Sequence, residues 1–380
     1  MRSPGAFFLC LWLSLAGHAW AQSELRPHYK PVTPGLDYAH IRTTNQPWSI
    51  HIARLHRSRS DLAIVSTLGK SHIQGLSPLP AQAKSVPPAL GRALVAVNGD
   101  FFLIKPGPYQ GDPEGLQILN GEFISTPGLL SFWVEGKALH IEKLLSAMTV
   151  TWPDGDKTPL GLNQTPRPDN VVLFTPILGA ATRATNSVEI ILERVDGQPW
   201  LPLQVSHQYS GRVRAINLCG NTPLQPDLVV LTVGSKLTNH LTSLSSGAVV
   251  QFSTKLSKDL SQASTAIGGG PFLVHEGKVQ KWPERKGGDN YLLPRHPRTA
   301  LGFNTRSFFL VEVDGRQKEL SMGMSFAELA AFMKSLGCTE AMNLDGGGSA
   351  TFWLDGQVMN SPSDKHLRSL ANALAIVRRN

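Results

Sequence analysis

The sequence predicts an α+β fold in which mixed, largely antiparallel sheets with few helices form a single large domain. Turn signals recur between segments that alternate apolar and polar residues, a pattern typical of β-hairpins. These turns are Asn120-Gly121, Glu135-Gly136, Asp154-Gly155, Asp196-Gly197, Glu276-Gly277, Asp314-Gly315 and Asp355-Gly356. No low-complexity linker divides the 380 residues into halves, and only one segment carries a full set of helix signals.

The first 21 residues are expected to be a secretory signal peptide. Arg2 supplies a positive charge, residues 6–17 supply a short apolar core, and residues 18–21 supply a small-residue cleavage site. The apolar core is too short to cross a bilayer, and no later segment is long and apolar enough to do so. We therefore expect export to the periplasm or beyond the cell, without stable membrane insertion. Residues 22–40 are expected to be an irregular lead-in, and residues 41–380 the domain.

The clearest strands are expected at 49–55, 94–98, 188–193, 308–313 and 371–377. Ser325 and Glu328 form a capping box, which starts a helix whose apolar face continues to Leu336. Gly337 suits the position after the helix end. Shorter helices are expected at 80–84 and 237–244. The long helix leads into the apolar segment 340–344, so Asp345 is expected at the C-terminal end of a buried strand.

Composition limits the classes of partner. The formal net charge is +8, but the basic residues are scattered, so we expect no nucleic-acid partner. A mild positive field favours anionic substrates or cell-envelope polymers. Beyond the expected signal peptide, Cys219 and Cys338 remain. Export permits a disulfide between them, and two buried free thiols are an equal alternative.

Asp345 is the principal candidate for chemistry. It is followed by Gly346, Gly347, Gly348 and Ser349, between two apolar segments. Serial glycines let a ligand approach the main chain, and their N–H groups can form an anion-binding concavity. Most glycine triplets are loops or linkers, but a linker would lie between polar residues. An acid beside such a concavity indicates chemistry on a charged substrate.

Four other segments add candidate groups. Asn98 and Asp100 follow an apolar strand, where the alternative is an ordinary hairpin turn. Asp112 and Glu114 lie in a loop, and a carboxyl group raised in pKa there could act as an acid. The triplet of residues 268–270 precedes another strand and would form a second main-chain wall. Arg298 and Thr299 begin a further strand, and a guanidinium suits a phosphate or carboxylate unless it is a surface arginine.

Other catalytic classes lack their motifs. The sequence contains no Gly-x-Ser-x-Gly elbow, no His-Glu-x-x-His motif and no complete phosphate-binding loop. It also contains no zinc-type cysteine and histidine spacing. We therefore expect neither a serine hydrolase nor a zinc peptidase.

In their order along the chain, these segments resemble the phosphodiester glycosidase family, in its shorter, bacterial, exported form. The resemblance covers residues from about 40 to the C-terminus. It rests on four strings and on Phe352, Gly356 and residues 361–364; the strings are Asn98-Gly99-Asp100-Phe101-Phe102, Gly268-Gly269-Gly270-Pro271, Arg298-Thr299-Ala300-Leu301-Gly302 and residues 343–349.

The resemblance implies a hydrolase that cleaves the sugar C1–O bond of a sugar-1-phosphodiester, such as a GlcNAc-1-phosphodiester, and releases a phosphomonoester. Asp345 would act at C1 or on the attacking water, with Glu114 as second carboxylate. Arg298 and the amides of residues 346–348 would bind the phosphate. The other expected substrate-binding residues are Asn98, Asp100, Gly269, Gly270, Thr299, Asn343 and Ser349, of which Asn98 and Asn343 would hold sugar hydroxyls or orient Asp345.

The alternative is a non-catalytic module that binds or scaffolds envelope polysaccharide or exopolysaccharide through the same cleft. Asp345, Asp100 and Glu114 offer hard oxygen ligands, but their spacing matches no known metal loop. We therefore expect no metal and no cofactor at this site.

Overall fold

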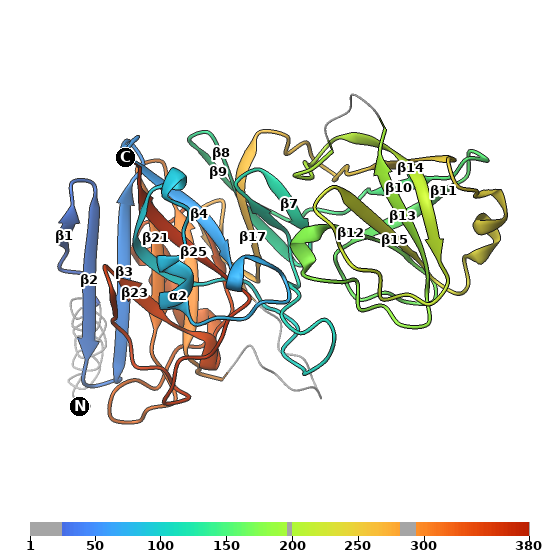
Figure 1. Ribbon diagram of the computed structural model, residues 1–380. Helices are drawn as coiled ribbons and strands as arrows, with labels where there is room; N and C mark the ends of the chain where they lie inside the picture. Colours follow the sequence, from blue (N-terminus) through green and yellow to red (C-terminus); the bar gives the residue numbers. More distant parts are fainter. Residues whose placement is uncertain (1–24, 196–199, 282–293, 380) are drawn as a thin grey trace, which may run out of the picture.

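The computed structural model describes residues 25–195, 200–281 and 294–379 (Figure 1). The expected signal peptide and the Asp196-Gly197 turn lie outside the described residues. Within them, three open sheets and a closed barrel carry the fold, with two α-helices, α2 (Leu79–Lys84) and α3 (Phe326–Ser335). Short 3-10 turns are η1 (Gly69–Ser71), η2 (Pro88–Leu90), η3 (Pro176–Leu178), η4 (Thr238–Ser243) and η5 (Gly347–Ser349). The predicted α+β class is confirmed.

The largest sheet has eight strands, all paired antiparallel. Their order is β1 (Lys30–Thr33), β2 (Leu36–Thr43), β3 (Trp48–His56), β21 (Ser307–Val313), β20 (Arg298–Phe303), β22 (Glu340–Asn343), β18 (Phe272–His275) and β19 (Lys278–Val279). One face packs on α3 through Ile52, Val311 and Leu329, and the other face packs on a second sheet.

The expectation of an irregular lead-in over 22–40 is wrong, because β1 and the first half of β2 lie there. Gly35 adopts a φ of 82° and turns the chain between the two strands. Leu36 and Ala39 are then buried against the neighbouring strand β3. The sheet thus begins before residue 41, the expected start of the domain.

The second sheet has five strands, in the order β24 (Gln357–Val358), β23 (Phe352–Leu354), β5 (Arg92–Asn98), β25 (Asn372–Arg378) and β4 (Leu62–Leu68). Leu301 and Leu310 of the eight-stranded sheet share one core with Val97 and Leu374 of this sheet. Helix α2 covers the outer face. The ends of β5 and β22 therefore face a common edge of this sandwich.

The third sheet is β7 (Glu122–Ser125), β6 (Gln117–Leu119), β17 (Ala263–Gly269), β8 (Leu130–Glu135) and β9 (Ala138–Glu142). The barrel is β10 (Thr149–Thr151), β11 (Lys157–Leu162), β12 (Val171–Phe174), β15 (Leu228–Val233), β13 (Val188–Arg194), β14 (Gln208–Asn217) and β16 (Val249–Ser253). The barrel lies at one end of the molecule, and the third sheet lies beside it (Figure 1). The two share a core in which Trp133 of β8 meets barrel residues.

Local signals predicted most turns correctly. The turns at 120–121, 135–136, 154–155, 276–277 and 355–356 each join two adjacent antiparallel strands. The predicted hairpin at Asp314-Gly315 is wrong: the Asp314 carboxylate accepts a hydrogen bond from the Ser361 N–H, and the chain continues toward α3. The expected helix at 237–244 is a 3-10 turn.

The capping box of α3 is confirmed, since Ser325 Oγ accepts from Glu328 N and Glu328 Oε2 accepts from Ser325 N. Gly337 adopts a φ of 86° beyond the helix end, as expected. Cys219 is exposed, Cys338 is buried, and both are free thiols. None of the helices in the described ranges has both the length and the apolar character that a membrane span needs.

Candidate functional site

Asp345 lies where the ends of strands from two sheets meet. It follows β22 of the eight-stranded sheet by two residues, as the sequence predicted. Its backbone N–H donates to the carbonyl oxygen of Gly99 at 3.0 Å, immediately after β5 of the five-stranded sheet. This bond joins the two loops that carry most of the candidate residues.

Asn98 connects three segments beneath this junction. Its Nδ2 donates to the carbonyl oxygen of Asp345 at 2.6 Å. Its Oδ1 accepts from the hydroxyl of Thr299 at 2.6 Å and from the backbone N–H of Thr351 at 3.1 Å. Asn98 and Thr299 are almost fully buried. This arrangement favours the orienting role expected for Asn98 over contact with a sugar.

Asp100 is buried against two glycines. A Cβ built at Gly268 would lie 2.1 Å from Asp100 Oδ2, and one at Gly115 would lie 2.6 Å from it, so only glycine fits at either position. Oδ1 accepts from the N–H of Phe101 at 2.8 Å, whereas Oδ2 has no hydrogen-bond partner among the described residues. Burial raises the pKa of this carboxyl group well above its usual range, and the charges of Asp345 and Glu114 raise it further.

The Asp345 carboxyl group is partly buried, and burial raises its pKa to about 6. Hydrogen bonds from Ser349 and from the Gly346 N–H, and the charge of Arg368, act in the opposite direction, whereas Glu114 raises the pKa. Near neutral pH, this group can therefore exchange its proton during a reaction.

Glu114 is exposed, and its charge also affects the carboxyl group of Asp112. Burial, followed by the Glu114 charge, raises the pKa of Asp112 to about 8. The fold thus brings Asp100, Glu114 and Asp345 into one electrostatic neighbourhood, although 231 positions separate Glu114 and Asp345.

The expectation that all three amides of the 346–348 triplet face a phosphate is wrong. The Gly346 N–H donates to Asp345 Oδ1 at 2.8 Å, and the Gly347 N–H donates to the carbonyl oxygen of Pro297 at 2.9 Å. The triplet enters the tight turn η5, in which Gly347 adopts a φ of 59°. These amides therefore position the loop rather than forming an open cradle.

Gly348 has a steric role. A Cβ there would lie 2.0 Å from Asp364 Oδ2 and 2.2 Å from Arg368 Nη2. Those two side chains form an ion pair of 2.7 Å, and Arg368 Nη1 also donates to Ser349 Oγ at 3.3 Å. Because Gly348 has no side chain, the guanidinium of Arg368 can lie against the loop that carries Asp345.

Arg298 has a different orientation from the one expected. Its Nε donates to the carbonyl oxygen of Met324 at 3.0 Å, and its guanidinium carbon lies 3.9 Å from the centre of the Phe326 ring. The side chain is 6 % exposed. Its guanidinium is therefore held beside α3, although its own main chain lies next to Gly346. The predicted phosphate contact stays a prediction.

The second glycine triplet holds β17 against β22. The Gly270 N–H donates to the carbonyl oxygen of Asn343 at 2.7 Å, and Asn343 Nδ2 donates to the Gly270 carbonyl oxygen at 3.0 Å. A Cβ at Gly269 would lie 2.6 Å from the Asn343 carbonyl oxygen. Asn343 Oδ1 is buried without a partner among the described residues, which leaves it as a possible acceptor.

Arg368 is the main site residue that the sequence did not single out. It is 29 % exposed, and its charge acts directly on Asp345. The string that ends at Asp364 belonged to the resemblance, and Arg368 lies four positions later. The sequence signal that could have identified Arg368 is the acidic and basic pair Asp364 and Arg368, four positions apart and C-terminal to the glycine triplet. Arg316 also lies near the loop, 3.1 Å from a Cβ built at Gly347.

The arrangement combines a carboxyl group of shifted pKa, a buried neighbouring carboxyl group and a partly exposed guanidinium. Such a set can move a proton near neutral pH and bind an anion beside it. Groups of three or more metal-type donors do occur among the described residues, at His51, Glu312 and Asp314 and at Asp154, Asp156 and His240. Those groups do not include Asp345.

The phosphodiester glycosidase family model matches residues 220–377. N-acetylglucosamine-1-phosphodiester alpha-N-acetylglucosaminidase from Bos taurus is 41 % identical over 68 residues, which are 18 % of this chain and 12 % of that protein. The enzyme of the same name from Homo sapiens is 40 % identical over 68 residues, or 18 % of this chain and 13 % of that protein. The aligned segments thus span only about an eighth of these relatives.

Two solved structures share the fold over most of the chain. A hypothetical protein from Synechocystis superposes with a TM-score of 0.73 at 18 % identity, over 92 % of this chain and 64 % of that one. A Burkholderia pseudomallei protein, whose description suggests export, gives a TM-score of 0.68 at 22 % identity, over 88 % of this chain and 75 % of that one. These similarities show the fold alone.

Proposed function

The chain belongs to the phosphodiester glycosidase family, which matches residues 220–377, and from this premise we propose that it hydrolyses sugar-1-phosphodiesters. Water would replace the phosphate oxygen at C1, which yields the free sugar and a phosphomonoester. The observation that carries the proposal is the Asp345 carboxyl group, whose pKa is raised to about 6, beside Arg368 on a loop within the matched segment. The relatives' name suggests a GlcNAc-type sugar.

Asp345 acts at C1 or on the attacking water in this proposal. Either role needs its ionised form, which predominates above pH 6. Asn98 holds the Asp345 carbonyl group and so keeps the loop in register. Glu114, which is exposed, is the second carboxylate and the group with more freedom to meet a substrate.

Arg368 and Ser349 are our primary candidates for binding the phosphate, because Arg368 is partly exposed and donates to Ser349 Oγ. A guanidinium stabilises the negative charge that grows on the departing phosphate. A phosphomonoester is already a good leaving group, so strong acid assistance is less necessary than in an ordinary glycosidase. Arg298 is a second candidate, and it would first have to leave the Met324 carbonyl group.

The signal-like residues 1–21 support export, and we extend the proposal to a periplasmic or secreted location. The substrate would then be an envelope or extracellular glycan that carries a sugar-1-phosphodiester. Fractionation of cells that express the full chain tests this part: mature protein confined to the cytoplasm would contradict it.

The reaction is tested on a chain that starts at residue 22, with a panel of sugar-1-phosphodiesters in water enriched in oxygen-18. Cleavage of the C1–O bond leaves the released phosphomonoester without the label. Labelled phosphomonoester would show cleavage of the P–O bond and contradict the proposed reaction. Saturable binding of a glycan without product at any enzyme concentration would instead favour the binding module.

A further inference from the structure

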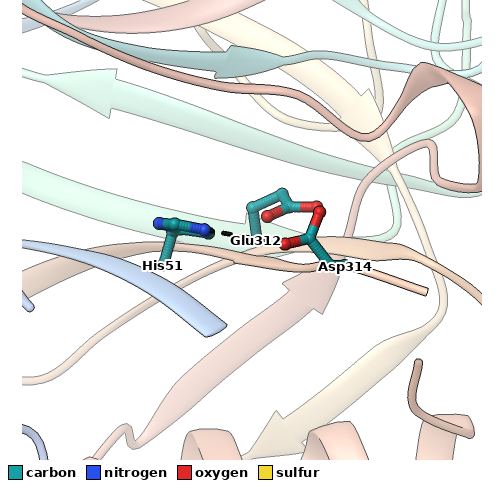
Figure 2. A group of neighbouring side chains, drawn as sticks. All are labelled: His51, Glu312 and Asp314. Atoms are coloured by element: carbon teal, nitrogen blue, oxygen red, sulfur yellow. Dashed lines mark ion pairs between the residues drawn. The ribbon is translucent and has the colours of Figure 1, made fainter. Parts of the chain in front are cut away.

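A cluster of three ionisable side chains lies inside the sandwich, apart from the Asp345 carboxylate. His51 on β3 and Glu312 on β21 are direct cross-strand partners, and Asp314 follows β21 on the same side as Glu312. All three are at most 2 % exposed. Figure 2 shows the three side chains pointing toward one another. A buried polar cluster of this kind is costly unless its charges are compensated.

The outer oxygens of the two carboxylates are held by the protein. Asn360 Nδ2 donates to Glu312 Oε1 at 3.1 Å and to Asp314 Oδ1 at 3.3 Å. The N–H of Ser361 also donates to Asp314 Oδ1, at 2.8 Å. The other oxygens, Glu312 Oε2 and Asp314 Oδ2, are left for a further partner. Glu312 Oε2 is fully buried and has no hydrogen-bond partner among the described residues.

The His51 ring is held in the same way. Its Nδ1 lies 2.8 Å from the hydroxyl oxygen of Tyr38, and the His40 ring stacks on it at 4.3 Å between centres. Its Nε2 faces Asp314 Oδ2 at 3.7 Å, the pair joined by the dashed line in Figure 2. A histidine that binds a metal through one ring nitrogen typically has its other ring nitrogen fixed by a hydrogen bond of this kind.

The charges of the cluster call for a cation. Glu312 and Asp314 are both buried and lie two residues apart on the same side of the sheet, so their negative charges would repel each other without a compensating charge. Among the described residues, these two acids form an ion pair between Asp314 and His51. A doubly charged cation would balance both carboxylates, whereas a single proton would neutralise only one of them.

We propose that His51 Nε2, Glu312 Oε2 and Asp314 Oδ2 bind one divalent transition-metal ion of the zinc type. One donor atom from each residue lies within 4.8 Å of the others. Ligands at about 2.1 Å around a shared tetrahedral ion are about 3.4 Å apart, so the 3.7 Å between His51 and Asp314 needs only a small contraction. Imidazole with carboxylates is a zinc-type ligand set.

A metal ion at this site would stabilise the loop that carries Asp345 through the neighbouring strands. Glu312 is the cross-strand partner of Thr299, whose hydroxyl donates to Asn98 Oδ1. Asn98 in turn donates to the Asp345 carbonyl oxygen. The ion would join β3 to β21 and stabilise this edge of the sandwich. It has a structural role here and no place in the hydrolytic step.

The test measures metal in the mature chain, from residue 22, after expression with added zinc and manganese and purification without chelators. Mass spectrometry of the elements should find about one zinc or manganese ion per folded chain. Glu312→Gln, which keeps the size of the side chain, should lower the metal content at least tenfold. Tyr38→Phe should weaken metal retention about 10- to 100-fold through the loss of ring orientation.

The matched control is Glu340→Gln, because Glu340 also faces a histidine, His275 at 2.9 Å, on the same sheet. This variant should keep its metal. Folded wild-type protein without zinc or manganese would overturn the proposal, as would Glu312→Gln protein that keeps the ion. If Glu312→Gln fails to fold, the metal content of the wild-type protein decides. The proposal then also requires that removal of the metal lowers the melting temperature of the wild-type protein. None of these readouts depends on hydrolysis of any substrate.

Discussion

At the residue scale, burial sets the chemistry of the Asp345 carboxyl group. A carboxyl group in water is ionised well below neutral pH, but here burial outweighs three favourable interactions and raises the pKa to about 6. Burial of Asp345 therefore lowers the stability of the folded protein at neutral pH, because the ionised form of this group is disfavoured in the folded state. Functional sites commonly carry such groups.

Activity should follow the ionisation of Asp345. If its carboxylate form acts, kcat/KM rises about tenfold per pH unit below pH 6 and levels off above it. Initial rates between pH 4 and pH 8, on protein verified as folded at each pH, measure this. A profile that falls with rising pH across this interval would contradict a role for the ionised form.

Substitution of Arg368 should mainly lower activity, whereas substitution of Arg298 should mainly lower stability. Arg368→Ala should lower kcat/KM by about 100-fold with little change in unfolding free energy, because Arg368 lies at the site and is partly exposed. Arg298→Ala should lower the unfolding free energy by about 2 kcal/mol, since it removes a buried hydrogen bond to the Met324 carbonyl group and the stacking of the guanidinium on Phe326 of α3. Urea unfolding and steady-state kinetics on both variants check this. Unchanged kinetics in Arg368→Ala would remove it from the phosphate site.

At the element scale, local signals predicted the hairpins and helix α3 well. Asn120 and Gly121 both adopt positive φ in the turn between β6 and β7, and the Ser325 capping box starts α3 as expected. These features depend on contacts within a few residues. The role of Gly348 depends instead on Asp364 and Arg368, which the sequence could not place over it.

Gly348→Ala should therefore displace the ion pair between Asp364 and Arg368, since the new Cβ would lie about 2 Å from both side chains. We expect kcat/KM to fall at least tenfold. Gly107→Ala is the matched control, because a Cβ there meets nothing within 4 Å. Equal rates for both variants would show that the close approach at Gly348 does not matter for catalysis.

At the scale of the whole molecule, the sequence predicted the class of fold, but it predicted neither how the sheets pack together nor that one of them closes into a barrel. Asp345, Asn98 and Glu114 lie in three distant segments of the chain, and only the family resemblance implied that they act together; their meeting in the structure depends on the packing of two sheets. The closed barrel of β10 to β16 was not expected either. Some of its strands, such as β11, alternate like those of an open sheet, others, such as β15, are buried throughout, and closure is decided by the pairing of β10 with β16. Such long-range pairings leave no local signal.

The two free cysteines report on the integrity of this packing. Cys219 is exposed, whereas Cys338 is buried and burial raises the pKa of its thiol to about 12. In the mature native chain, a thiol reagent should titrate one cysteine rapidly and the second only after denaturation. Two rapid reactions would indicate that the core around α3 is open, and none would indicate a disulfide.

The most direct test of the central claim compares Asp345→Asn with Asp355→Asn, a change at an exposed turn. Asp345→Asn should lower the rate of phosphomonoester release from a GlcNAc-1-phosphodiester at least 1000-fold. Its melting temperature at pH 7 should be unchanged or higher, because the cost of burying a charge disappears. Asp355→Asn should keep full activity. Release by folded Asp345→Asn at the wild-type rate would contradict the assignment of the catalytic carboxylate.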